Sequence, residues 1–264
     1  MYEIYSYHNN QSMEVPKYIF IVPYRDREAH RIFFLNYMEY ILEDYSKDSY
    51  EIVFSHQNDR RPFNRGAMKN IGFDYIRKKY PAHYQDMVFV FQDVDTMPHK
   101  KNLLNYDVSR GEVKHFYGYT FALGGLFSIT GHDFESIDGF PNYWEWGFED
   151  NIIQKRALSN KLTINRNTFY TIHDMEILHF FDHLKKDIDM RVLKKQIDKT
   201  LERDGLKSLK KVNYAYNSQT NMVDVHDFEC SYSHKNISRH THNMKNGTKI
   251  QYNKRNPTMR MRLY

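Results

Sequence analysis

The sequence predicts an α/β protein with a mostly parallel central sheet flanked by helices. Short apolar runs of strand length alternate with segments of helical apolar spacing over residues 17–91. The short runs are continuously apolar, which is typical of parallel strands with both faces covered. The chain has 264 residues, of which 41% are hydrophobic, so it is long enough to bury a full core.

Five elements are predicted in order over this part of the chain. They are a strand, a helix, a strand, a helix and a strand at residues 17–22, 28–45, 50–54, 64–80 and 87–91. The second helix stops before Pro81, which cannot continue a helix. Further along, a glycine-rich turn is expected at residues 121–131, and helices at residues 152–159 and 187–203.

Polar segments follow each of the three predicted strands. These are PYRDR at residues 23–27, SHQNDRRPFNR at residues 55–65 and QDVDTMP at residues 92–98. In open parallel sheets, ligands bind beyond the carboxyl ends of the strands. We therefore expect these polar side chains to meet in a binding site at one edge of the sheet.

Two acidic clusters can hold a cation. Asp93 and Asp95 lie two residues apart, so in a regular strand they share one face and can approach one hard divalent ion, whose usual co-ligand is a diphosphate. Taken alone, however, two aspartates at this spacing are in most proteins a capping or solvated pair. The segment HDMEILHFFDH adds possible ligands, but His179 can also be a hydrogen-bonded core residue between Leu178 and Phe180.

Basic and aromatic residues provide a second set of candidates. Arg25, Arg27 and Arg65 follow strands, where guanidinium groups hold phosphates or stack on a base; surface salt bridging is the alternative. Trp144 and Trp146 flank an acid in WEWGFED, an arrangement that suits a sugar ring, although core packing also explains tryptophans.

Charge and composition limit the classes of protein. The last 34 residues, 231–264, hold eight basic and no acidic side chains, so the net charge of +5 arises from the tail. Such a tail is typical of a solvated extension, or binds phosphate, nucleic acid or a membrane surface. One cysteine, Cys230, excludes an internal disulfide and suits a reducing compartment, and no apolar run reaches the roughly 20 residues of a membrane helix.

In combination, the ordered motifs resemble the β-1,4-galactosyltransferase family of inverting enzymes with the GT-A nucleotide-sugar transferase fold. The segments that carry the resemblance are FNRGAMKNIGF, FVFQDVD, GGLFSI, GFPNYWEWGFED and DGLKSL. The resemblance implies an extension at residues 1–16, a catalytic domain at residues 17–214 and a basic extension at residues 215–264. It also implies a UDP-sugar donor, a glycan or glycoprotein acceptor, a Mn²⁺ or Mg²⁺ cofactor and no nucleic-acid partner.

The resemblance assigns the donor and metal sites residue by residue. Its nucleotide-binding segments correspond to Pro23, Tyr24, Arg25, Arg27, Phe63 and Arg65. Asp95 and His179 correspond to metal ligands, and Asp93 is expected on the nucleotide side. Glu176 stands where some members use methionine as a third ligand, with His183 as a less favoured substitute. A carboxylate is a harder ligand than a thioether, which predicts better support of activity by Mg²⁺ than in those members.

The family pattern WGWGxEDDD is WEWGFEDN here. Glu149 then corresponds to a contact with the donor sugar, Asp150 to the catalytic base and Trp146 to the aromatic ring that covers both sugars. Gly125 corresponds to the glycine that lets substrate approach closely. Asn151 replaces an aspartate that helps bind acceptor hydroxyls. Ala122 replaces the large tyrosine of vertebrate enzymes, so UDP-GalNAc and UDP-GlcNAc are candidate donors beside UDP-galactose.

Two other classes of function are considered. A catalytically inactive carbohydrate-binding or scaffold protein on the same fold would be expected to lose the base or the metal site, and both are kept. A metal-dependent phosphatase or nuclease accounts for the acids but leaves WEWGFED, FNR and DGLKSL without a role. The lysine-, asparagine- and isoleucine-rich composition suits an A+T-rich microbial or viral genome, and we expect a cytoplasmic enzyme, in the host cytoplasm if viral.

Overall fold

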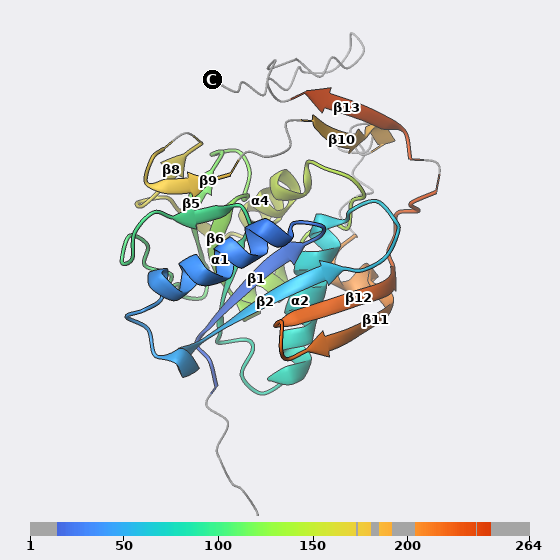
Figure 1. Cartoon of the computed structure of the whole chain (residues 1–264). Helices are drawn as coiled ribbons and strands as arrows, with labels where there is room; N and C mark the ends of the chain where they lie inside the picture. Colours follow the sequence, from blue (N-terminus) through green and yellow to red (C-terminus); the bar gives the residue numbers. More distant parts are fainter. Residues whose placement is uncertain (1–14, 173, 181–184, 192–203, 236, 244–264) are drawn as a thin grey trace, which may run out of the picture.

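A nine-stranded mixed sheet forms the centre of the protein in the computed structural model (Figure 1), which describes residues 15–172, 174–180, 185–191, 204–235 and 237–243. The strand order is β11-β12-β2-β1-β3-β6-β5-β7, with β8 paired to β5. The strands span β1 Tyr18–Tyr24, β2 Tyr50–Gln57, β3 Val88–Gln92, β5 Glu112–Gly118, β6 Leu126–Thr130, β7 Thr163–Asn165, β8 Tyr170–Thr171, β11 Lys210–Asn217 and β12 Met222–Glu229.

The parallel part of the sheet confirms the predicted alternation. Strand β1 pairs in parallel with both β2 and β3. The helices between them are α1, Glu28–Ile41, and α2, Arg65–Lys79. Because β1, β2 and β3 run in the same direction, the segments that follow them meet at one edge, as expected.

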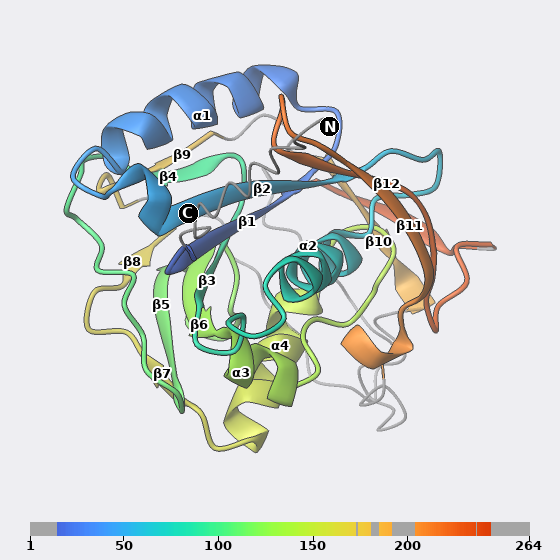
Figure 2. The ribbon, with the colours of Figure 1, turned by 90° about the horizontal axis from the view of Figure 1, so that it is seen from below.

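The two faces of the sheet are covered by different helices. Figure 2 shows α1 on one face, and on the other α2 with α3, Gly131–Ser136, and α4, Glu149–Ser159. Alternate residues of β1 divide between the two cores: Phe20 belongs to the cluster with α1, and Ile21 to the cluster with α2. Both faces of β1 are therefore buried, which explains its continuously apolar sequence.

The second half of the sheet changes direction. Strand β6 is antiparallel to β3, and β5 is antiparallel to β6. The glycine-rich segment at residues 121–131 is thus a turn followed by a buried strand. This arrangement places Gly124 and Gly125 beside Asp93, whose backbone N–H donates to the Gly125 carbonyl over 3.1 Å.

Three of the recognised motifs join around Asn142. The backbone N–H of Asn142 donates to Asp204 over 2.6 Å, and its side chain donates to the hydroxyl of Ser208 over 3.0 Å. Asn64, which caps α2 by accepting from the backbone N–H of Ala67, also donates to the Asn142 carbonyl over 3.0 Å. The segments FNR, GFPN and DGLKSL therefore fix the path of the chain into WEWGFED.

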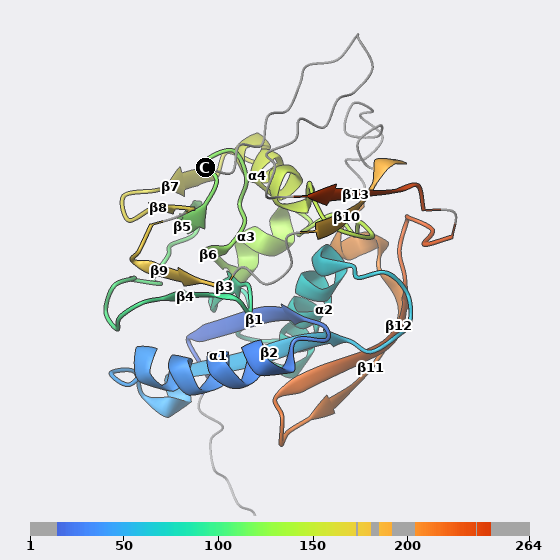
Figure 3. The ribbon, with the colours of Figure 1, turned by 45° about the horizontal axis from the view of Figure 1, so that its top comes forward.

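The prediction of a charged helix at residues 187–203 is wrong for the first residues of that range. Residues 187–189 belong to β10, Lys185–Asp189, which pairs antiparallel with β13, Arg239–Asn243, while residues 192–203 lie outside the described ranges. The pairing of β10 with a strand about 50 residues away decides its conformation. Figure 3 shows β10 and β13 side by side, apart from the central sheet.

The C-terminal segment contributes to the central sheet as well. The predicted domain boundary at residue 215 falls within β11, and β12 pairs in parallel with β2. The predicted N-terminal extension, residues 1–16, lies almost wholly outside the described residues. Within the part of the chain that the structure describes, none of the helices combines the length and apolarity needed to cross a bilayer.

Candidate functional site

A cavity of about 330 Å³ opens at the carboxyl ends of the parallel strands. It brings together most of the residues predicted to bind the nucleotide. Its lining consists of Pro23, Arg25, Arg27, Phe63, Arg65, Asp93, Val94, Asp95, Glu145, Trp146, Lys186 and Asp187. Arginines and carboxylates of the segments that follow the strands thus face one open cavity, as expected, together with the rings of Phe63 and Trp146.

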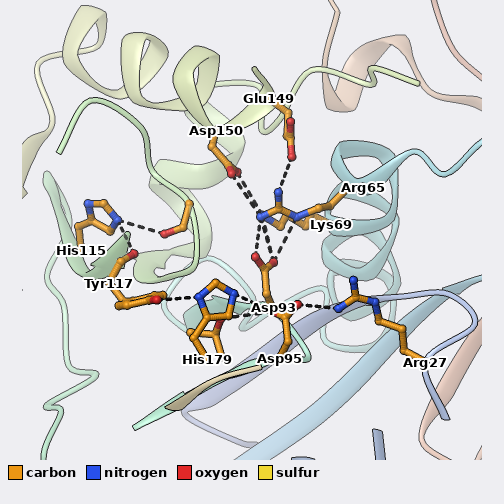
Figure 4. Close-up of polar contacts among 12 residues, drawn as sticks. Arg27, Arg65, Lys69, Asp93, Asp95, His115, Tyr117, Glu149, Asp150 and His179 are labelled. Atoms are coloured by element: carbon orange, nitrogen blue, oxygen red, sulfur yellow. Dashed lines mark hydrogen bonds and ion pairs between the residues drawn. The ribbon is translucent and has the colours of Figure 1, made fainter. Parts of the chain in front are cut away.

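The turn after β3 points Asp93 and Asp95 in different directions. The strand ends at Gln92, and the backbone N–H of Thr96 donates to the Asp93 carbonyl over 3.1 Å, so the expected shared strand face is not formed. Asp93 pairs with Arg65 at 2.7 Å, whereas Asp95 pairs with Arg27 at 2.6 Å (Figure 4). The two carboxylates therefore serve neighbouring parts of the site.

Arg65 connects three carboxylates. It is the first residue of α2, and its guanidinium lies 2.7 Å from Glu149, 2.7 Å from Asp93 and 3.2 Å from Asp150. Glu149 and Asp150 are the first two residues of α4, where the helix dipole favours negative charge. Burial opposes the charge of Arg65, but the surrounding carboxylates raise its pKa well above the ordinary value.

The neighbouring carboxylates differ in their tendency to ionise. Burial raises the pKa of Glu149, and the charge of Asp150 adds to the effect. Burial also disfavours the charge of Asp93, but the cations of Arg65 and Lys69 outweigh it and lower the pKa of Asp93. Asp93 is therefore held ionised, whereas Glu149 binds a proton more readily than an ordinary glutamate.

Asp150 lies between two cations and a glycine. Lys69 of α2 places its ammonium 3.4 Å from one oxygen of Asp150, and Arg65 contacts the other. A Cβ atom at Gly124 would lie only 2.5 Å from an Asp150 oxygen, so the carboxylate requires a glycine there. The prediction from sequence missed Lys69, because a lysine inside a helical pattern gives no sign that its side chain is only 2% exposed.

His179 faces Asp95. Strand β9, Ile177–His179, pairs with β4, Thr96–Pro98, which sets Nε2 of His179 3.9 Å from Asp95. Its Nδ1 lies 2.7 Å from the hydroxyl of Tyr117. Burial lowers the pKa of His179, although Asp95 and Asp93 act in the opposite direction. With Nδ1–H donating to Tyr117, Nε2 presents a lone pair towards Asp95.

Asp95 and His179 fit a divalent metal ion. A carboxylate oxygen and a neutral imidazole facing each other are ligands that manganese accepts, and Tyr117 orients the imidazole as outer partners of metal-binding histidines do. Among the described residues, no group of three or more histidine, cysteine or acidic side chains is arranged to hold a metal. Oxygens of a diphosphate are further ligands that such an ion would accept.

Glu176 is not brought to this pair. Its carbonyl accepts from the backbone N–H of His99 over 2.9 Å, which extends the β4–β9 ladder, and its carboxylate lies 3.3 Å from His99 and 3.5 Å from Lys100. The structural reason for expecting a preference for Mg²⁺ is therefore missing. His183, the other ligand considered, lies outside the described residues.

The remaining predicted residues surround the site rather than line the cavity. Tyr24 is buried, with its hydroxyl donating to Glu28. Gly125 has a φ of +72°, and a Cβ atom there would lie 2.8 Å from the Tyr117 carbonyl, so glycine is required. Ala122 is buried in the same loop, and Asn151 donates to the Phe121 carbonyl over 3.1 Å.

An exposed aromatic pair lies beside Asn151. The rings of Tyr119 and Phe121 are stacked with centroids 5.0 Å apart, and Phe121 is 44% exposed. Such a surface suits the apolar face of a sugar ring. The prediction from sequence missed the pair, although the alternating aromatic residues of FYGYTF just before the glycines were a usable signal.

His115 supports the glycine turn from below. Its Nε2–H donates to the carbonyls of Tyr117, at 2.9 Å, and Gly124, at 3.1 Å, while Nδ1 accepts from Arg166 at 3.1 Å. This pattern uses both nitrogens of a neutral ring. Burial lowers the pKa of His115 to about 4, so the ring is uncharged at neutral pH.

We expect His115 to make the protein less stable in mild acid. Because the folded-state pKa is about 4 and the ordinary value is 6.5, only the unfolded state binds the proton between these pH values. The free energy of unfolding should therefore fall by up to about 3 kcal/mol from neutral pH to pH 4 through this residue. Denaturant unfolding of the wild type and His115→Gln between pH 7.5 and 4.5 should give a shallower decline for the variant; equal declines would contradict this assignment.

The sequence matches two family descriptions. The N-terminal region of glycosyl transferase group 7 matches residues 4–107, and the N-terminal domain of galactosyltransferase matches residues 106–183. β-1,4-Galactosyltransferase 4 of Cricetulus griseus is 27% identical over 76% of this chain and 60% of its own length. β-1,4-Galactosyltransferase 1 of Mus musculus is 30% identical over 73% of this chain and 50% of its own. The chain thus spans about half to three fifths of these relatives.

Solved structures show the same fold. The catalytic domain of Drosophila β-1,4-galactosyltransferase 7 in complex with xylobiose superposes with a TM-score of 0.64 and 23% identity, over 83% of this chain and 96% of that one. A mutant of that enzyme in complex with manganese, UDP-Gal and xylobiose gives a TM-score of 0.60 and 22% identity, with the same coverage. At this identity the likeness concerns the fold, which agrees with the predicted GT-A class.

Proposed function

The chain belongs to the group 7 glycosyltransferase family, and from this premise we propose that it is a metal-dependent inverting glycosyltransferase. It moves a hexose or N-acetylhexosamine from a UDP-sugar to a hydroxyl group of a glycan or glycoconjugate. One observation carries the proposal: the segments expected to bind the nucleotide line one cavity together with Asp95, which faces His179, and Arg65, which pairs with the carboxylates at the start of α4.

The cavity supplies the groups that a nucleotide diphosphate requires. Arg25, Arg27 and Lys186 line it and offer positive charge for phosphate oxygens, with forked guanidinium donors on the arginines. Phe63 and Trp146 line it as well and offer apolar faces for a base and a sugar ring. These residues bind and orient the donor, and orientation supplies much of the rate enhancement of a two-substrate reaction.

Asp95 and His179 would hold the metal ion, which we propose to be Mn²⁺. Held there, such an ion would supply positive charge to offset the charge that develops on the departing diphosphate. Arg27, which pairs with Asp95 at 2.6 Å and lines the same cavity, would add positive charge for the diphosphate. The hydroxyl of Tyr117, 2.7 Å from Nδ1 of His179, orients the imidazole so that Nε2 faces Asp95.

Asp150 acts as the base. Its carboxylate accepts the proton of the acceptor hydroxyl as that oxygen attacks the anomeric carbon on the face opposite UDP, so the C–O bond to UDP breaks and the configuration inverts. Arg65 and Lys69 fix its position from one side, and Gly124 leaves the space for it. We assign to Glu149, at the start of the same helix, the contact with hydroxyl groups of the donor sugar.

The proposal also covers the class of donor sugar and the region that binds the acceptor. The small side chain of Ala122 leaves galactose, N-acetylgalactosamine and N-acetylglucosamine as candidate sugars. The stacked pair Tyr119 and Phe121, beside Asn151, forms a platform for an acceptor sugar. We also propose a cytoplasmic location. The one cysteine of the sequence, Cys230, is a free thiol, which suits a reducing compartment.

Release of UDP tests the proposed function. The purified protein should release UDP from one of UDP-Gal, UDP-GalNAc, UDP-GlcNAc and UDP-Glc in the presence of Mn²⁺, and EDTA should abolish the release. Asp95→Ala should lose this metal-dependent activity, whereas Glu176→Ala should keep it, because Glu176 pairs with His99 and Lys100. An equal loss of activity in both variants would show that Glu176 does contribute to the metal site. Absence of turnover with every donor would contradict the proposed function.

A further inference from the structure

The C-terminal strand β13 is joined to the donor cavity through β10. Lys186 and Asp187 of β10 line the cavity, and their register partners in β13 are His242 and Thr241. In addition to the pairing of the two backbones, the side-chain hydroxyl of Thr241 donates to the Asp187 carboxylate over 2.7 Å. Residues 239–243 lie beyond the two matched family regions, which together extend from residue 4 to residue 183. A segment outside the family pattern therefore holds two residues of the cavity wall.

The same strands also hold Trp146. Its backbone N–H donates to the Asp187 carbonyl over 2.8 Å, and Glu145 forms an isolated antiparallel bridge with Ile188. Arg239 of β13 reaches the carboxylate of Glu145 at 2.5 Å. The turn at Glu145 and Trp146 is thus connected to β13 in two ways. It contacts β10, which pairs with β13, and Glu145 forms an ion pair with Arg239 of β13.

Glu145 adopts a conformation that favours glycine. Its φ is +66°, in the left-handed region, which costs a residue with a Cβ atom about 1–2 kcal/mol. The family pattern WGWG has glycine at this position, and this chain has WEWG. The glutamate side chain is only 11% exposed and its carboxylate is occupied by Arg239. The substitution that adds strain to the turn thus also adds the contact to the tail.

We propose that β13 helps to shape the donor site. Arg239 is a positioning residue, which acts through Glu145 on Trp146. The inference rests on the proposed function, because it assigns the cavity to a UDP-sugar. The Arg239–Glu145 pair fixes the turn from one side and β10 fixes it from the other, so Trp146, Lys186 and Asp187 face the donor in a preformed arrangement. Preformed contacts strengthen binding because less freedom is lost when the ligand binds.

Binding of UDP in the presence of Mn²⁺, measured by calorimetry, tests this inference. Arg239→Ala should weaken binding about fivefold, the effect of losing an ion pair of about 1 kcal/mol. Arg239→Lys, which keeps the charge, should recover most of the affinity. In a Glu145→Gly background, Arg239→Ala should have no further effect, because its partner is already gone. The matched control is Lys211→Ala on β11, which breaks an exposed ion pair with Glu229 of β12.

The outcomes separate the inference from the proposed function. If the wild type binds UDP and Arg239→Ala binds it equally well, or if Arg239→Ala weakens binding as much in the Glu145→Gly background, the inference is overturned. If the wild type does not bind UDP with Mn²⁺ at all, the proposed function fails instead. With an active donor, KM for that donor should rise in Arg239→Ala with little change in kcat; a uniform fall in kcat alone would show a purely structural role.

Discussion

Asp150→Asn should lower kcat for sugar transfer by about 10²- to 10⁴-fold, the range expected for loss of a general base. Asparagine has nearly the same shape but cannot accept the proton of the acceptor hydroxyl. Asp150 is absent from the residues that line the cavity, so UDP binding with Mn²⁺ should change little. Transfer kinetics combined with calorimetric titration of UDP measure the two effects separately.

The matched control for this variant is Asp86→Asn. Asp86 forms an exposed ion pair with Arg110, with the two side chains 79% and 50% exposed. Its replacement should leave both transfer and binding unchanged. If Asp150→Asn retained near wild-type kcat, or lost activity only through loss of UDP binding, Asp150 would not be the base.

Arg65→Met should lower the free energy of unfolding at pH 7 by about 3–5 kcal/mol, the usual cost of removing one partner from a buried ion pair. The guanidinium is the common partner of Asp93, Glu149 and Asp150. When methionine replaces it, Lys69 remains as a nearby cation. Denaturant unfolding monitored by circular dichroism measures the loss. The same variant should also lose transferase activity, because Arg65 fixes the base.

The pH dependence of this loss gives a second, independent result. Without Arg65, the carboxylates are costlier to keep ionised, so their pKa values rise and protonation relieves part of the repulsion. The stability deficit of Arg65→Met should therefore shrink between pH 7 and pH 5. Arg110→Met, which breaks the exposed pair with Asp86, should cost less than about 1 kcal/mol at both pH values. An equally small, pH-independent effect of Arg65→Met would contradict the central role given to this arginine.

Local pattern was sufficient to predict the parallel half of the fold. The apolar runs at β1 and β3 are buried throughout, β2 is buried from Val53 to Ser55, and α1 and α2 carry apolar residues at helical spacing. The direction of β6 was not predictable, because a short apolar run has the same sequence in a parallel and an antiparallel pair. The strand β10 was mistaken for the start of a helix, because its partner β13 follows about 50 residues later.

The cavity could be predicted for a related reason. Residues such as Arg25, Arg65 and Asp93 follow strands, and parallel strands end at one edge. Residues that join the site from elsewhere were missed. Lys69 reaches it from inside a helix and Tyr117 from near the end of β5, where local pattern indicates only packing. Glu176 was expected beside His179, but the β4–β9 pairing gives it His99 and Lys100 as partners.

The central claim is that Asp150 directs attack on a UDP-sugar from the face opposite UDP. The most direct test is time-resolved proton NMR of the first product formed from the turned-over α-linked UDP-sugar with Mn²⁺, with water or an added glycan as acceptor. We predict the β-anomer before mutarotation sets in. Formation of the α-anomer would show retention of configuration, and would contradict the role of Asp150 as the base of a single displacement.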